Sequence, residues 1–145
     1  MSSSAPTLHI AEPPAQYLLR PGLVVDCSCL AGFVFDEDWN EQARQQLDGH
    51  TLHAPHLLHA EIANVAVKKL RRGESHATHG LAEAAAMEIE LHPVNAPAAA
   101  ALAMQYGLSA YDAAYLWLAA DLKCPLATFD DKLAAAAKAH LAGLP

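Results

Sequence analysis

Long apolar runs are absent from the sequence, although 53% of its residues are hydrophobic. No stretch approaches the roughly 20 consecutive apolar residues of a membrane-spanning helix. The start of the chain also lacks the basic residues and apolar core of a secretory signal. We therefore expect a soluble, cytoplasmic protein without a membrane partner.

Cysteine and basic residues are scarce. The 3 cysteines are odd in number and carry no local signature of a nucleophilic thiol, so we expect small, reduced, buried side chains. Lysine and arginine number 9 against 16 acidic residues, which gives a net charge of -7. Proteins that grip nucleic acid through many phosphates usually carry a basic face. The charge therefore disfavours tight nonspecific binding, while it leaves room for a metal-bridged contact and suits a basic protein partner.

The 145 residues are typical of a single domain. Residues 1–22 are rich in Ser, Pro and Ala without a sustained period, and we interpret them as an N-terminal arm, either loose or forming an added edge element. In residues 23–145, apolar β-branched runs alternate with helical patterns. Expected strands cover 23–26, 50–55, 87–94 and 125–129, and expected helices cover 29–35, 36–47, 57–72, 97–107, 109–122 and 130–143.

This alternation predicts a three-layer α/β/α domain with a central parallel sheet flanked by helices. Such sheets bind ligands beyond the carboxyl ends of their strands. Asp26 ends the first expected strand and Asp130 follows the last, so both acids belong at that edge. The alternative is that each acid only caps the helix after it, with Ser28 assisting at Asp26.

Two further acids interrupt apolar helix faces. Glu61 has Leu57 and Val65 four residues to either side, and Asp112 is flanked by leucines in the same way. A buried, unpaired carboxylate is costly and needs a cation, a metal or a shifted pKa. The alternatives are that Glu61 reaches solvent or a lysine, and that Asp112 only completes a capping box begun by Ser109.

Four acids from four distant segments are explained best together, because like charges need a cation to lie close to one another. Mg²⁺ and Mn²⁺ prefer oxygen ligands, and one or two such ions activate water for hydrolysis of a phosphodiester. The set formed by Asp26, Glu61, Asp112 and Asp130 therefore predicts a metal-dependent hydrolase.

The stretch LSAYDAAYLWLAADLKCPLATFDDKL, with VVDCS and AEIANV in the first half of the chain, carries a family resemblance. From about Leu23 to Leu141 the sequence resembles the PIN-domain nucleases, and among them the toxins of VapBC toxin–antitoxin pairs. The resemblance implies a parallel sheet between helices, a Mg²⁺ or Mn²⁺ site, endonucleolytic cleavage of RNA, a homodimer and a cognate antitoxin protein. The arm before Leu23 departs from the family pattern.

The resemblance also assigns roles to residues by position. It implies that the metal is held by the four catalytic acids, Asp26, Glu61, Asp112 and Asp130. It implies supporting roles for Ser28 and Thr128 as polar neighbours, for Asn64 beside Glu61, and for Asp131 as an alternative to Asp130.

A dense basic cluster ends the helix expected at 57–72, and it either grips RNA phosphates or is a solvated helix end favoured by the helix dipole. Its members are Lys68, Lys69, Arg71 and Arg72.

The chain also has 9 histidines, of which His53, His56 and His59 recur every three residues. Pro55 interrupts that series and no cysteine lies nearby, so the pattern does not favour zinc.

Two other functional classes remain open. A catalytically silent binding module would keep the fold and use the acids as helix caps. A receiver-like phosphoacceptor or an aspartate-nucleophile phosphatase would also place acids at strand ends. The phosphatase is disfavoured because Ser28 stands where its second acid would be expected.

Overall fold

The computed structural model describes residues 6–14, 21–35 and 40–145. Its strands are β1 His9–Ala11, β2 Gly22–Val25, β3 Thr51–Pro55, β4 Ile89–His92 and β5 Leu126–Thr128. Its helices are α1 Cys27–Phe35, α2 Asn40–Leu47, α3 Leu57–Arg71, α4 Ala77–Ala86, α5 Ala96–Tyr106, α6 Ala110–Leu122 and α7 Asp131–Ala142.

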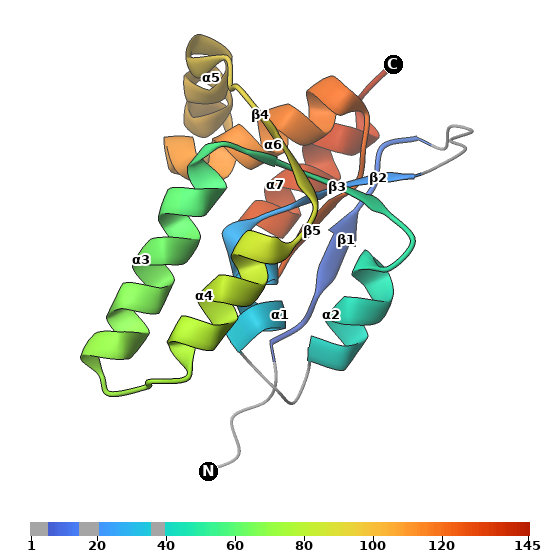
Figure 1. Cartoon of the computed structure of the whole chain (residues 1–145). Coiled ribbons are helices and arrows are strands. Elements are labelled where there is room, and N and C mark those ends of the chain that lie inside the picture. The colour runs from blue at the N-terminus through green and yellow to red at the C-terminus, as the bar shows by residue number, and fades with distance from the viewer. Residues whose placement is uncertain (1–5, 15–20, 36–39) are drawn as a thin grey trace.

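The strands form one sheet in the order β1-β5-β2-β3-β4 (Figure 1). Strands β5, β2, β3 and β4 pair in parallel, while β1 pairs antiparallel with β5. The parallel sheet predicted from the alternation is therefore confirmed. The segment 9–11, which the sequence left open between a loose arm and an edge element, forms the edge strand β1.

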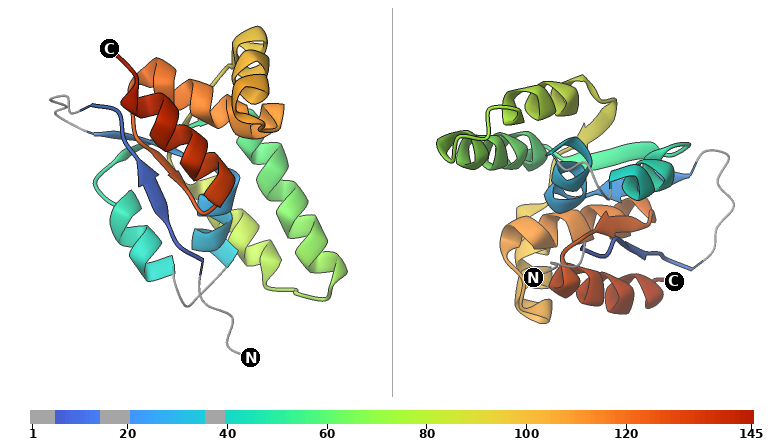
Figure 2. Two further views of the ribbon diagram at one scale, coloured as in Figure 1. Left: turned by 180° about the vertical axis from the view of Figure 1, so that it is seen from behind. Right: turned by 90° about the horizontal axis from the view of Figure 1, so that it is seen from below.

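Helices cover both faces of the sheet, as Figure 2 shows in the view from below. Helices α5, α6 and α7 lie on one face, and α1 to α4 lie on the other. Strand β2 is buried along its whole length, which is expected of a central parallel strand covered on both sides. Leu23 and Val25 pack with Phe33 of α1, whereas Val24 belongs to the cluster that contains Leu116 of α6. The predicted three-layer architecture is confirmed.

Two local features differ from the expectations, and the helix expected at 36–47 is confirmed over the residues that the structure describes. Helix α1 begins at Cys27, two residues before the expected start. Of the helix expected at 36–47, residues 40–47 are helical, and 36–39 lie outside the described residues. Helix α4 was not predicted, because Gly80 weakens its helical pattern. A Cβ at Gly80 would lie 2.5 Å from the Phe35 ring, so the glycine lets α4 pack closely against α1.

No helix in the described part of the chain is both long enough and apolar enough to span a membrane.

Candidate active site

Two neighbouring parallel strands deliver the first acids to one edge of the sheet. Strands β2 and β5 pair with Val25 opposite Ala127, so both chains leave the sheet at the same end. Asp26 directly follows β2, and Asp130 follows β5 by two residues. Both acids therefore lie at the carboxyl edge of the sheet, as predicted. Open parallel sheets bind their ligands at this edge.

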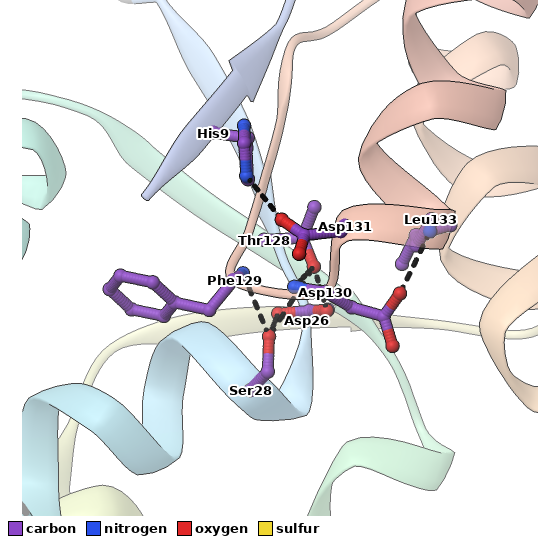
Figure 3. A network of polar contacts seen from close by, with 8 residues as sticks. All are labelled: His9, Asp26, Ser28, Thr128, Phe129, Asp130, Asp131 and Leu133. Carbon is purple, nitrogen blue, oxygen red and sulfur yellow. Dashed lines mark hydrogen bonds and ion pairs between the residues drawn. The ribbon is translucent and has the colours of Figure 1, made fainter. Parts of the chain in front are cut away.

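Asp26 lies at the centre of a buried hydrogen-bond network (Figure 3). Asp26 is only 4% exposed. Oδ1 accepts hydrogen bonds from Ser28 Oγ at 2.7 Å and from the Cys29 amide at 2.8 Å, and Oδ2 accepts one from the Thr128 hydroxyl. The Cys29 contact shows that Asp26 does cap α1, but Thr128 comes from the neighbouring strand. The network therefore fixes the carboxylate beyond what capping alone requires.

The surroundings of Asp26 favour its uncharged form. Burial raises the pKa of this carboxyl to about 6, with a smaller contribution from the negative charge of Asp112. The hydrogen bonds from Thr128, Cys29 and Ser28 oppose that rise, because they stabilise the carboxylate. A cation near Asp26 would relieve this cost by compensating the buried negative charge.

The two polar neighbours also join the strand ends to each other. Ser28 Oγ accepts a hydrogen bond from the Phe129 amide at 3.0 Å and lies 3.3 Å from Thr128 Oγ1. Thr128 Oγ1 in turn accepts from the Asp130 amide at 3.0 Å. The segment after β5 is thereby held against the start of α1.

Glu61 projects from α3 and is half-buried. The Tyr115 hydroxyl of α6 donates a 2.6 Å hydrogen bond to Glu61 Oε1. Burial raises the pKa of Glu61, the Tyr115 hydrogen bond opposes the rise, and Asp112 adds to it. Among the ion pairs of the described residues, none joins Glu61 to a lysine, so the lysine-paired alternative is not observed.

Asp112 and Asp130 both take part in helix starts. Ser109 caps α6 by accepting from the Asp112 amide at 3.1 Å, and Asp130 caps α7 by accepting from the Leu133 amide at 2.8 Å. Burial raises the pKa of Asp112, and the charge of Asp130 adds to the rise. Lys132 opposes it electrostatically. The caps are real, yet the two carboxylates also interact across the site.

Among the described residues, the two predicted supporting residues Asn64 and Asp131 make no hydrogen bond to Asp26 or Glu61. Asn64 is exposed on α3 one turn after Glu61, and within the described residues Glu61 takes its hydrogen bond from Tyr115 instead. Asp131 has a side chain that is 92% exposed and pairs with His9 Nε2 of β1 at 2.9 Å. Asp130, not Asp131, is the acid whose charge acts on Asp112.

Tyr115 and Lys132 were not predicted as site residues from the sequence. Tyr115 follows Asp112 by three residues, which places both on one side of α6, and this spacing was the available signal. Lys132 follows the Asp130/Asp131 pair in the sequence, and its positive charge acts on Asp112 of α6.

The donor set fits a hard divalent cation. The charge of Asp112 acts on Asp26 and on Glu61, and the charge of Asp130 acts on Asp112, so the four acids form one electrostatic unit. Carboxylate oxygens are the ligands of Mg²⁺ and Mn²⁺. Within the described residues, no three of these carboxylates bring oxygens within 4.8 Å of one another.

Comparisons with known proteins agree with this fold. The model of the family described as "PIN domain" matches residues 23–139. The chain belongs to the PIN-domain family. The solved structure described as "PAE2754 from Pyrobaculum aerophilum" covers 81% of this chain and 86% of its own, with a TM-score of 0.66 and 22% identity.

The curated relatives narrow the class to VapC-like PIN domains. "Ribonuclease VapC3" of Pyrobaculum aerophilum is 35% identical over 120 residues, which cover 77% of this chain and 92% of that protein. "Ribonuclease VapC9" of Mycobacterium tuberculosis and "VapC ribonuclease Mb0985" of Mycobacterium bovis are each 32% identical over 115 residues, which cover 77% of this chain and 87% of theirs. The resemblance inferred from the sequence is thus confirmed.

Proposed function

We propose that this chain is a divalent-metal-dependent endoribonuclease that hydrolyses RNA phosphodiester bonds as the toxin of a type II toxin–antitoxin pair. One observation carries the proposal. Acids from four separate segments, among them the buried Asp26, act electrostatically on one another at the carboxyl edge of the sheet. Relatives named VapC ribonucleases support the same activity.

The metal ligands in this proposal are Asp26, Glu61, Asp112 and Asp130, and the metal is Mg²⁺ or Mn²⁺. When bound, the ion supplies an activated water and neutralises charge at the scissile phosphate. The chain supplies the orientation. Ser28, Thr128 and the Cys29 amide fix both oxygens of Asp26, and Tyr115 fixes Glu61.

The basic cluster at the end of α3 is the candidate for binding RNA phosphates. In the structure, two of its members lie near a carboxylate and two are exposed without such a neighbour among the described ion pairs. Lys69 and Arg72 lie 3.8 Å and 3.1 Å from carboxylate oxygens of Glu74. Lys68 and Arg71 are exposed. We therefore assign the phosphate contact to Lys68 and Arg71, whose loss should weaken RNA binding and flatten its salt dependence.

Two protein partners belong to the proposal. The net charge of -7 suits a basic antitoxin segment. We also propose a homodimer. Co-purification with the product of a neighbouring gene tests for the antitoxin, and the co-purified protein is then added to the cleavage reaction. A true antitoxin suppresses cleavage, while an unrelated basic protein does not. Sedimentation of the purified chain tests the dimer.

The chemistry of the product ends tests the mechanism. Hydrolysis by an activated water leaves a 5′-phosphate, whereas attack by the RNA's own 2′-hydroxyl leaves a 2′,3′-cyclic phosphate and needs no metal. Ligation-based sequencing of the cleaved RNA distinguishes these ends. Metal-independent cleavage with cyclic ends would overturn the mechanism, and a folded, metal-loaded chain that binds but never cuts its RNA would favour the silent binding module.

A further inference from the structure

A second group of metal-ligand side chains lies on the other part of the sheet, on strands β3 and β4. His53 Nδ1 lies 2.9 Å from His92 Nε2 and 3.4 Å from Glu90 Oε2. All three ligand atoms lie within 4.8 Å of one another. None of these residues is among the four acids of the candidate active site.

Strand register places the three side chains on one face of the sheet. His53 is the register partner of Glu90, and His92 follows Glu90 by two residues, so all three point the same way. His53 is also the register partner of Val24 in β2. The group therefore bridges β3 and the edge strand β4 on the face that Val24 shares.

The absence of a side chain at Gly22 leaves space for the ring of His53. A Cβ at Gly22 would lie 3.2 Å from His53 Nε2 and 2.6 Å from Cys124 Sγ, so the glycine makes room for both side chains. Nε2 thus faces Gly22, and Nδ1 is left to face Glu90 and His92. Burial raises the pKa of Cys124, whose thiol donates to the Leu122 carbonyl, so the cysteine is not in the form that binds metal.

We propose that His53, His92 and Glu90 form a site for a borderline divalent transition metal such as Zn²⁺, which ties β4 to β3. Two imidazoles and a carboxylate are a common zinc ligand set, and three protein ligands leave one position for water. Ligand atoms in a tetrahedral site with bonds of about 2.0–2.1 Å lie about 3.3 Å apart. The observed 2.9 Å and 3.4 Å separations need only small adjustments to meet that spacing.

The exposure and the chemistry of the ligand side chains support this assignment. The side chain of His53 is 13% exposed and that of Glu90 is 65% exposed, so an ion can enter from solvent while one ligand stays fixed in the sheet. Nitrogen ligands favour Zn²⁺ over Mg²⁺, which distinguishes this site from the four acids.

Co²⁺ absorption of the full chain tests the proposal, because tetrahedral Co²⁺ gives an intense visible spectrum and octahedral Co²⁺ does not. We expect one tetrahedral ion per EDTA-stripped chain, displaced by Zn²⁺. His92→Gln and Glu90→Gln each remove one proposed ligand, and each should weaken Co²⁺ binding by about 10–100-fold or more. His56→Gln, a change at an exposed histidine, is the matched control and should bind as the unaltered chain does.

Asp26→Asn separates this site from the active site and should leave the tetrahedral spectrum intact. A spectrum that survives His92→Gln and Glu90→Gln, or one that is lost in Asp26→Asn, would overturn the proposal. Absence of tetrahedral Co²⁺ in the folded, unaltered chain would do the same and would identify the three residues as a hydrogen-bonded group without metal.

Discussion

The buried Tyr115 hydroxyl donates a 2.6 Å hydrogen bond to Glu61 Oε1, and this contact links α6 to α3 across the candidate active site. Tyr115 is 1% exposed, and burial together with the Glu61 carboxylate raises its pKa, so the hydroxyl remains a donor at every physiological pH. Glu61 is thereby held in one orientation before any ligand arrives. Tyr115 is a positioning residue in this account.

Replacing Tyr115 by Phe should therefore reduce RNA cleavage without abolishing it. A hydrogen bond to a charged group contributes about 1.5–3 kcal/mol, which corresponds to roughly a 10–150-fold change in rate if all of it serves positioning. The loss should be partly recovered at high Mn²⁺ concentration, since weaker positioning weakens metal binding. A Tyr115→Phe chain that cleaves normally at low metal concentration would remove Tyr115 from the site.

Asp26→Asn should stabilise the metal-free protein at neutral pH. The pKa of Asp26 is about 6 in the folded chain, against an ordinary value of 3.8, so the folded state binds the proton more tightly than the unfolded state does. Stability therefore falls as the pH rises from about 4 to about 6 and stays low above that range. Asparagine carries no charge, so it avoids this loss.

Chemical denaturation in EDTA measures this effect. At about pH 7.5 the Asp26→Asn variant should exceed the unaltered chain by about 1–3 kcal/mol in free energy of unfolding, and at about pH 4 the difference should vanish. Added Mg²⁺ should stabilise the unaltered chain more than the variant. Equal stabilities at both pH values would show that the Asp26 charge is already compensated.

Asp130→Asn separates capping from metal binding. Asparagine caps a helix about as well as aspartate, so the free energy of unfolding should change by only about 0.5 kcal/mol. The carboxylate charge is lost, and we expect RNA cleavage to fall at least tenfold. Asp131→Asn is the matched control one residue away, and its exposed side chain predicts near-normal cleavage. The opposite result would reassign the fourth acid to Asp131.

Removal of residues 1–20 tests the role of the arm. We infer that residues 23–145 form the nuclease unit, because β1 contributes none of the four acids. Without β1, strand β5 becomes an unpaired sheet edge, which promotes association. The truncated chain should melt several degrees lower and aggregate, while the folded fraction still cleaves RNA. Loss of cleavage per folded molecule would assign the arm a part in the site.

Sequence alone predicts best where the signal is local. Strands β2 and β5 are short apolar runs followed by acids, so both strand and candidate ligand could be identified from adjacent residues. Helix α7 follows from its alanines and its Asp130 cap. Each of these features depends on residues close together in the chain.

Other features depend on contacts between distant segments and could not be predicted in this way. Strand β1 has three residues and exists through its pairing with β5. Helix α4 depends on Gly80 packing against Phe35. The series of His53, His56 and His59 did not favour zinc, and the partner of His53 is instead His92, which the register of β3 and β4 brings beside it.

Cleavage of total cellular RNA by the purified chain is the most direct test of the central claim, which is hydrolysis by a divalent metal held by the four acids. Reactions contain Mg²⁺ or Mn²⁺, with EDTA and the Asp26→Asn variant as controls. The account predicts discrete fragments that require the metal and are absent in the variant. Fragments that persist in EDTA or in Asp26→Asn, or no cleavage by the folded, metal-loaded, inhibitor-free chain on any cellular RNA, would contradict it.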